Sequence, residues 1–495
     1  IIYCIILPLV SLEAQSKGDF TWVMGYPPND SAGGFGGTIL NFSSGLNMRF
    51  FNTPTFVGNS AQICNEDGQT VLYSNGCKIL NSEHEVISNG DGLNPGQFYD
   101  FWCDRYEVDY GSHQGLLALP LPGHPDKYYL FHLAWYRLPG PPWTEYLRDF
   151  YSTRIDMSAN NGLGAVVEKN RLILQDTNLI DNVTAVRHGN GRDWWVVLPR
   201  GASDLIYTFL LTPEGLQGPF EQRIGVSTSV RGFSGGQIVF SPDGSKFARV
   251  SASPDGIDIF NFDRCSGKFS CPRRLPPPDD PRGALGGVAI SPNSRYLYVS
   301  ATVKMFQYDL WAGDIARSKV LLGEYDNFLS NGQLWTTFYL QRLAPDGKIY
   351  MSATNGVKYL HVVHQPDSAG LACDFRQHDL ELPTHNGFCL PNFPYFRLYD
   401  APNSPCDTLG IDAPTADWQP WLPVDRLILQ PNPVSGNLVT VRYSPCSGGR
   451  LSVYDLAGRR LLSVIAGQEG EYTIDCSDWP TGMYIVSFMP NGSAC

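Results

Sequence analysis

A turn followed by a short strand recurs along most of this chain. The turns are rich in Pro, Asn, Asp and Gly, and the strands alternate aromatic and β-branched residues, at Thr70–Tyr73, Tyr128–Phe131, Trp194–Val197, Phe247–Val250, Tyr296–Val299 and Ile349–Met351. Successive copies lie roughly 50 to 65 residues apart, enough chain for a four-stranded antiparallel sheet. Because such a sheet cannot bury both faces alone, the copies are expected to stack around an axis. The repeat therefore predicts an all-β propeller.

The repeat also predicts the number of blades. Six copies are visible, and Phe20–Val23 and Phe393–Phe396 at the two ends are strand-like, so we expect them to combine into a seventh blade that closes the ring. The alternative is a pair of β-sandwiches with similar turns. A sandwich does not require a regular period, so the spacing favours the propeller.

Several segments resemble known propellers. The turn-strand units that begin at Ser241-Pro242-Asp243-Gly244 and Ser291-Pro292-Asn293 are similar to those of WD-repeat-like bacterial propellers. Together with Leu72–Cys77, Tyr128–His132 and Leu390–Phe393, they resemble a family of Bacteroidota surface proteins. In that family a propeller precedes a secretion tail, and most members have no assigned activity.

The last part of the chain has a different pattern. Residues 401–424 are rich in Pro, Asp and small residues and are expected to form a linker after a propeller at 15–400. Short alternating strands then follow at Val439–Tyr443, Leu451–Tyr454, Arg460–Val464, Tyr472–Asp475 and Met483–Phe488. We expect residues 425–495 to form a small Ig-like β-sandwich.

Three ordered motifs in this sandwich resemble the type A sorting domain of type IX secretion cargo. They are Gln430–Pro433, Val453–Arg459 and Trp479–Val486, and they contain the motif residues Pro431, Asn432, Pro433, Asp455, Gly458, Gly482 and Tyr484. The resemblance implies that the type IX secretion machinery is a partner and that the protein is secreted or held at the outer cell surface. It also implies attachment to surface lipopolysaccharide, after which the tail is often removed. The family usually ends in a basic strand, whereas this sequence ends Asn491-Gly492-Ser493-Ala494-Cys495.

The first residues are typical of an export signal. Ile1–Val10 is apolar and Ser11–Gln15 carries small residues, which predicts a partial signal peptide at 1–14, cleaved after Ala14. The alternative is a short buried strand. No other apolar run is long enough to span a membrane.

Cysteine content and charge agree with export. Of the 12 cysteines, Cys4 lies in the signal and Cys495 at the end, which leaves an even number for disulfides in an oxidising compartment. A Gly-containing turn separates Cys265 from Cys271, so we predict a disulfide that closes this hairpin. A zinc site would require paired ligands such as Cys-x-x-Cys, which do not occur. The net charge of −12 argues against a nucleic-acid partner.

Two segments are candidates for a functional site. One is an acidic segment in which Asp91 and Asp104 lie among aromatic residues. Such a segment could bind Ca²⁺ or stack a sugar, or it could serve only as a loop that connects two blades. The other is a Pro-rich loop with Trp135, Tyr136 and Trp143, which either form a ligand surface or clamp the loop onto its own blade.

The sequence contains no recognisable catalytic motif. It has no Gly-x-Ser-x-Gly elbow and no phosphate-binding loop, and its histidines lack ligand spacing, so we predict no catalytic residue, metal or cofactor. The favoured hypothesis is a non-enzymatic propeller that binds a glycan, surface lipopolysaccharide or another surface protein, as an adhesion or scaffold module. The alternative is an extracellular polysaccharide hydrolase or lyase with Asp91 or Asp104 in an axial pocket.

Overall fold

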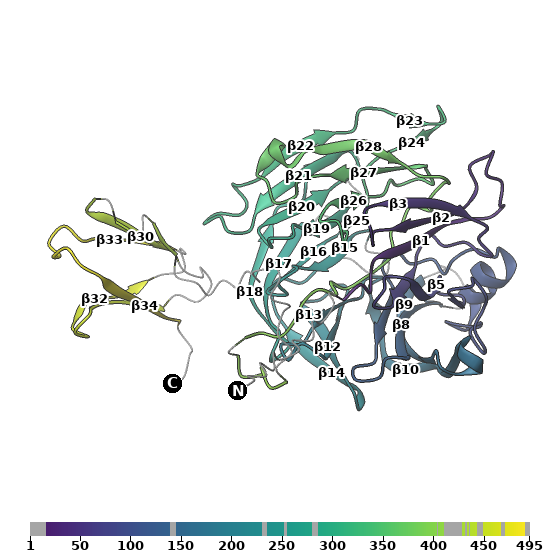
Figure 1. Ribbon diagram of the computed structural model, residues 1–495, viewed down its shortest axis with the longest axis horizontal. Coiled ribbons are helices and arrows are strands. Elements are labelled where there is room, and N and C mark those ends of the chain that lie inside the picture. Colours follow the sequence, from purple (N-terminus) through teal and green to yellow (C-terminus); the bar gives the residue numbers. More distant parts are fainter. Residues whose placement is uncertain are drawn as a thin grey trace, which may run out of the picture. The chain divides into compact units, whose positions relative to one another are not determined.

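A computed structural model describes residues 16–138, 145–229, 235–251, 255–279, 286–402, 404–409, 428–430, 433–434, 436–442, 449–466 and 471–490. The chain divides into two compact units: Ile1–Tyr308 with Lys319–Pro420, and Asp309–Ser318 with Trp421–Cys495. Figure 1 shows both units, coloured along the sequence. The predicted signal peptide, with its cleavage position at Ala14, lies outside the described residues.

The described part of the large unit is a series of antiparallel sheets taken in chain order (Figure 1). Two sheets have three strands: β1 (Thr21–Tyr26), β2 (Gly36–Asn41) and β3 (Asn47–Phe51), then β4 (Ala61–Cys64), β5 (Thr70–Ser74) and β6 (Ile79–Asn81). Two four-stranded sheets follow: β7 (Leu116–Pro120), β8 (Lys127–Arg137), β9 (Glu145–Asp156) and β10 (Ala165–Leu179), then β11 (Thr184–Arg187), β12 (Trp194–Pro199), β13 (Leu205–Thr212) and β14 (Gly215–Arg223).

Three further four-stranded sheets complete the series. They are β15 (Gln237–Phe240), β16 (Lys246–Val250), β17 (Ile257–Asp263) and β18 (Lys268–Leu275); β19 (Gly287–Ile290), β20 (Tyr296–Ser300), β21 (Lys304–Asp309) and β22 (Val320–Glu324); and β25 (Gln341–Leu343), β26 (Ile349–Met351), β27 (Tyr359–Val363) and β28 (Phe375–Glu381). A hairpin of β23 (Leu329–Ser330) and β24 (Leu334–Trp335) precedes the last sheet, and the short helices are η1 (Tyr99–Arg105), η2 (Asn160–Gly162) and η3 (Gly370–Cys373).

The repeated turns have a side-chain explanation. In the turn before β16, the Ser241 hydroxyl accepts the backbone N–H of Lys246 at 2.9 Å and donates to Asp243. In the turn before β20, the Ser291 hydroxyl accepts the N–H of Tyr296 at 2.8 Å and donates to Asn293. The Ser-Pro-Asp/Asn signature therefore closes the hairpin between the first two strands of these two sheets.

The sheets are arranged as a β-propeller. First strands of successive sheets contact one another, as β11 does with β15, β15 with β19 and β19 with β25. A parallel bridge between Gln114 and Asn182 links the sheets of β7 and β11 in the same way. Adjacent strands are antiparallel, so each first strand runs in the same sense around the axis. The number of blades stays a prediction.

The sequence predicts that the two ends of the large unit combine into one blade; they lie against each other, but β1 pairs with β2 and β3 in a sheet of its own. Phe393 packs on Trp22 of β1 with ring centroids 6.4 Å apart, and Asn392 forms a parallel bridge to Ala61. Residues 393–396 nevertheless form no strand in the structure. The Asn392 side chain instead donates to the carbonyls of Leu116 and Val183, at 2.8 and 2.9 Å. The final segment thus contacts several sheets near the axis.

The predicted disulfide between Cys265 and Cys271 is wrong. Cys265 pairs with Cys406, 141 positions later, and a second disulfide joins Cys77 to Cys103. Cys265 lies in the turn after β17, whereas Cys271 lies along β18, beyond the Asp263–Lys268 pair and at a break in the register. A hairpin bridge requires cysteines near each other across the strands, and this register separates them.

The described strands of the small unit form two three-stranded sheets. One has the order β29 (Ile428–Gln430), β30 (Leu438–Arg442), β33 (Glu471–Asp475), and the other β32 (Arg460–Ala466), β31 (Gly449–Asp455), β34 (Tyr484–Pro490). Val441, Leu451, Val453 and Ile474 form a core shared by both sheets. The unit is therefore a small sandwich, and its Ig-like topology stays a prediction.

Candidate functional site

One end of the propeller carries its longest connections. Because strands alternate in direction, the segments that lead into each first strand and the loops between second and third strands lie at the same end. We call this the loop end. It includes the segment of η1 before β7, the end of β8 with the start of β9, and the β23–β24 hairpin. Propeller ligands commonly bind at such loops.

At the loop end, the structure brings together the two segments that the sequence singles out. The Phe98 ring, next to η1, lies 6.1 Å from the Trp135 ring on β8, and the Arg137 guanidinium lies 5.1 Å from the Phe98 ring. The disulfide between Cys77 and Cys103 fixes η1 to the segment that follows β5. The acidic loop and the hairpin therefore form one aromatic lobe, residues 98–110 with 135–137.

Trp135 clamps this lobe. Its indole Nε1 donates to the carbonyl of Gly111 at 2.7 Å, and its backbone N–H donates to the Tyr110 hydroxyl at 3.1 Å. Gly111 has no room for a side chain, because a Cβ there would lie 2.8 Å from the Trp102 ring. Of the two readings of Trp135, these contacts favour the clamp.

Of the other predicted residues, Tyr136 and Asp104 belong to the lobe, whereas Asp91 does not. Tyr136 lies 5.5 Å from the Tyr146 ring and beneath the Arg148 guanidinium, at 4.0 Å. The Asp91 carboxylate is 76% exposed and lies 3.8 Å from Lys169 on β10, the outermost strand of its sheet, so it is at the periphery and not at the axis. Asp104 is exposed on η1, and Trp143 lies outside the described residues.

Two aromatic rings of the lobe are open to solvent. Phe101 and Tyr106 are 45% and 52% exposed, and their rings pack edge to face with centroids 4.8 Å apart. The exposed carboxylates of Asp100 and Asp104 lie on the same helix. The sequence shows these residues within the acidic loop, but their exposure depends on the disulfide and on Trp135, which a sequence pattern does not reveal.

A second group of polar residues lies at the loop end, in the segments that lead into β7 and β25. Asp109 accepts the backbone N–H of Asn59 at 2.6 Å, and burial raises the pKa of its carboxyl to about 6. His113 contacts the Tyr339 hydroxyl through Nδ1 and packs against Phe388, with ring centroids 5.1 Å apart. Burial lowers the pKa of His113 to about 4, so its ring is neutral at pH 7. No sequence pattern points to His113 or Tyr339, which are 226 positions apart.

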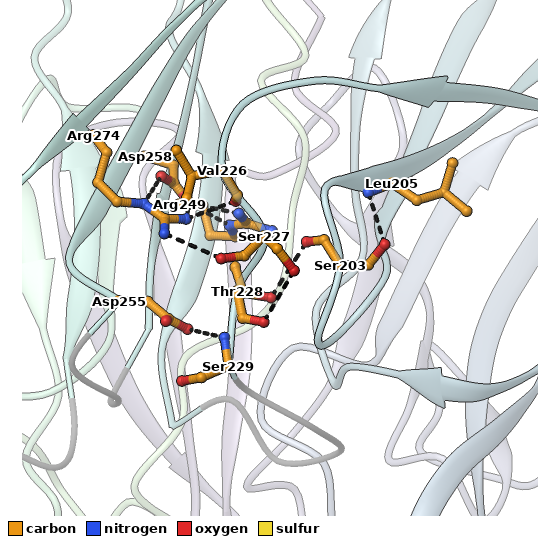
Figure 2. A network of polar contacts seen from close by, with 10 residues as sticks. All are labelled: Ser203, Leu205, Val226, Ser227, Thr228, Ser229, Arg249, Asp255, Asp258 and Arg274. Atoms are coloured by element: carbon orange, nitrogen blue, oxygen red, sulfur yellow. Dashed lines mark hydrogen bonds and ion pairs between the residues drawn. The ribbon is translucent and has the colours of Figure 1, made fainter.

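A buried ion network fixes another loop at this end. Asp258 accepts hydrogen bonds from Arg249 and Arg274, and Arg274 also donates to the carbonyls of Val226 and Ser227, at 2.9 and 3.3 Å (Figure 2). Asp255 accepts the N–H of Ser229 at 2.7 Å. The connection from β14 is thereby held on the next sheet through charge-assisted bonds.

The described residues also enclose a cavity of about 30 Å³ among the first strands, lined by residues of β11, β15, β19 and β25 together with Phe393 and Tyr395. Asp19 and Arg342 also line it, and Arg342 is bonded to Asn392 and to the carbonyl of Phe393. A cavity of this volume has room for a water molecule.

Within the described ranges, no three His, Cys, Asp or Glu side chains are grouped so as to hold a metal ion. Of the helices that the structure describes, none has the length and apolar character needed to cross a bilayer.

The small unit has its own arrangement of motif residues. Asp455 on β31 is the cross-strand partner of Tyr484 on β34. The Asp455 carboxylate accepts the N–H groups of Ala457 and Arg459, at 3.1 and 2.9 Å, and Gly458 supplies a φ of +79° to this turn. Gly482 lies in the exposed loop before β34, and Pro433 is exposed. Pro431 and Asn432 lie outside the described residues.

The fold and the terminal sandwich together define a propeller protein with an appended export unit. Residues 429–494 match the family model of the secretion system C-terminal sorting domain. The chain therefore carries the sorting domain of type IX secretion cargo and is secreted or displayed at the cell surface. No curated protein matches the chain.

Solved structures give weaker similarities. A protein from Lactobacillus plantarum has a TM-score of 0.43 at 12% identity, with 75% of this chain and 99% of that chain covered. A putative 6-phosphogluconolactonase from Bacteroides uniformis gives 0.43 at 12%, covering 75% and 98%. A periplasmic gluconolactonase from Pseudomonas aeruginosa gives 0.34 at 10%, covering 92% and 99%. At these values the similarities carry no inference about activity, and the fold rests on the strand pairing described above.

Proposed function

We propose that this protein is a non-enzymatic binding module that acts outside the cell, in adhesion or as a scaffold, with its ligand surface on the aromatic lobe. The observation that carries this proposal is the exposed pair of Phe101 and Tyr106, on a segment held by the Cys77–Cys103 disulfide. Rigid, exposed aromatic rings lose little conformational entropy on binding.

The ligand class that fits this surface best is a glycan. Sugar rings present apolar C–H faces that pack on aromatic rings, and their hydroxyl groups donate to carboxylates such as those of Asp100 and Asp104. A surface polysaccharide or lipopolysaccharide of neighbouring cells offers such rings in repeated units, which raises avidity. The competing ligand is another surface protein.

The experiment is a binding titration of the purified full chain against a panel of bacterial surface polysaccharides. The test variant is Phe101→Ala with Tyr106→Ala. The matched control is Phe220→Ala on β14, because Phe220 is also 46% exposed but lies on another sheet. We expect the double variant to lose affinity at least about tenfold and the control to bind as wild type does.

Two results would count against this assignment. If no polysaccharide binds and a surface-protein extract does, with the same dependence on Phe101 and Tyr106, the lobe serves a protein partner. If binding occurs but neither substitution weakens it, the ligand surface is elsewhere on the molecule.

A second candidate function is polysaccharide cleavage at the loop end, and one observation favours it. Asp109 has a carboxyl pKa raised to about 6, the range of a catalytic acid. Burial raises the pKa of the Cys389 thiol and the charge of Asp109 contributes to this rise, so the two groups are neighbours. Phe388, the residue before Cys389, is 37% exposed, so this neighbourhood borders solvent. The discriminating experiment is turnover of the same panel by wild type and Asp109→Asn. Turnover that the Asp109→Asn substitution abolishes would support the enzyme and displace the binding module.

A further inference from the structure

We propose that three apolar side chains of the small unit form the surface by which the type IX secretion machinery docks on this protein. They are Leu456, Met483 and Ile485, which we call the sorting corner. The proposal concerns export and does not depend on the ligand of the aromatic lobe.

Strand register brings the sorting corner together. β31 and β34 are antiparallel, with Asp455 opposite Tyr484 and Tyr454 opposite Ile485. Leu456, in the turn after β31, directly follows Asp455, and Met483 directly precedes Tyr484, so both lie at the same end of this strand pair. Leu456 and Met483, 27 positions apart in the sequence, therefore lie at one end of the sheet.

The sorting corner faces away from the core. Side chains of a strand alternate between faces, and Val453 and Val486, which are cross-strand partners, belong to the core of the sandwich. Ile485, one position before Val486, accordingly points outward and is 55% exposed. Leu456 and Met483 are 65% and 73% exposed. A single exposed apolar residue requires no explanation, but adjacent ones at such exposure are typical of a contact surface.

The motif residues hold this surface in place. The Asp455 carboxylate binds two backbone N–H groups of the turn that carries Leu456, and it pairs with Arg459 Nε at 3.1 Å. On the other strand, the Tyr484 hydroxyl donates to the carbonyl of Pro480, and the Tyr484 ring lies 5.2 Å from Trp479. The motif thus fixes the two segments that present Leu456 and Met483.

The secretion machinery is the occupant that these observations favour. Residues 429–494 match the sorting domain, so a partner must recognise this unit during export. The sorting corner lies directly beside Asp455, Gly458, Gly482 and Tyr484, the residues through which the sequence resembles other cargo. We therefore expect an apolar groove on the machinery as its counterpart. A second copy of this chain is the competing occupant.

The test is export of the full-length protein from its native cells. The test variant replaces all three residues, Leu456→Gln, Met483→Gln and Ile485→Thr. The matched control is Ile465→Thr, because Ile465 is 75% exposed on β32 of the same sheet but lies opposite Arg450, away from the corner. A conservative variant, Leu456→Met with Met483→Leu, keeps the surface apolar.

We expect the exported fraction of the triple variant to fall about tenfold, with folded protein left in the periplasm, while the control and the conservative variant are exported as wild type is. Thermal unfolding of each purified chain establishes that the variants fold. Normal export of the triple variant would overturn the proposal, and so would an equal loss in the Ile465→Thr control. If wild type is a dimer and the triple variant is a monomer that is exported normally, the sorting corner instead binds a second copy of this chain.

A deletion of residues 427–495 separates failure of this inference from failure of its premise. If the deleted chain is still exported, the small unit is not the export signal. If the deletion blocks export and the triple variant does not, recognition uses another part of the unit.

Discussion

Asp19 and Arg397, which are 378 positions apart, form a buried ion pair that joins the beginning and the end of the large unit. Both side chains are only 5% exposed, and Arg397 Nη2 donates to Asp19 Oδ2 at 3.0 Å. The Arg397 guanidinium also lies 4.7 Å from the Tyr395 ring. The pair therefore closes the propeller at the point where its last segment meets β1.

The first prediction concerns this pair. Arg397→Met leaves the Asp19 carboxylate buried without its partner, so we expect the free energy of unfolding to fall by about 3–5 kcal/mol. Urea denaturation of the purified chain measures the change. Arg223→Met is the control, because Arg223 pairs with Asp204 at the surface, where its side chain is 68% exposed, and such pairs contribute about 1 kcal/mol or less. Equal effects of the two substitutions would contradict the role given to Asp19 and Arg397.

The second prediction concerns the disulfides. A disulfide stabilises a fold mainly by restricting the unfolded chain, and Cys265–Cys406 closes a longer loop than Cys77–Cys103, 141 positions against 26. We expect removal of Cys265–Cys406 to cost about 5 kcal/mol and removal of Cys77–Cys103 about 3.5 kcal/mol. Thermal unfolding of the two Cys→Ser double variants measures this order. Non-reducing peptide mapping checks the pairing itself, and a peptide linking Cys265 to Cys271 would refute it.

The third prediction is a loss of stability in acid. Burial lowers the pKa of His132 and of His361 to about 3 in the folded protein, whereas the unfolded chain has the ordinary value near 6.5. Below about pH 6.5 the unfolded state therefore binds protons that the folded state does not. Each histidine should lower the free energy of unfolding by about 1.4 kcal/mol per pH unit as the pH falls from 6.5 to about 3.

The variant His132→Gln tests this pH dependence. Neutral His132 lies between Asn94 Oδ1, at 2.6 Å from Nδ1, and the Thr153 hydroxyl, at 2.9 Å from Nε2, and glutamine also offers a donor and an acceptor. We expect the slope of stability against pH between 6 and 4 to decrease by about 1.4 kcal/mol per pH unit. Chemical denaturation at a series of pH values gives this slope. An unchanged slope would mean that His132 takes up its proton over the same pH range in the folded and the unfolded protein.

The strand-and-turn repeat was sufficient to predict the propeller, because each Ser-Pro-Asp/Asn turn forms from residues within six positions of one another, as Ser241 and Lys246 show. The sorting domain was predictable for the same reason, since Asp455 and Gly458 shape a local turn. The disulfide partner of Cys265 could not be predicted, because Cys406 comes from the segment that leaves the propeller and not from the hairpin around Cys265. Nor could the sequence indicate that His113 contacts Tyr339 or that Asp109 accepts the N–H of Asn59, since these neighbours come from distant parts of the chain.

A ligand bound to the aromatic lobe at the loop end should slow amide hydrogen exchange there, which mass spectrometry measures. The amide protection of the full chain is compared with and without the surface polysaccharide that binds it most tightly. We predict slower exchange in residues 98–110 and at the adjoining ends of β8 and β9, with the turns at 241–245 and 291–295 unchanged. Protection confined to those turns, or to the first strands that line the cavity of about 30 Å³, would contradict the account.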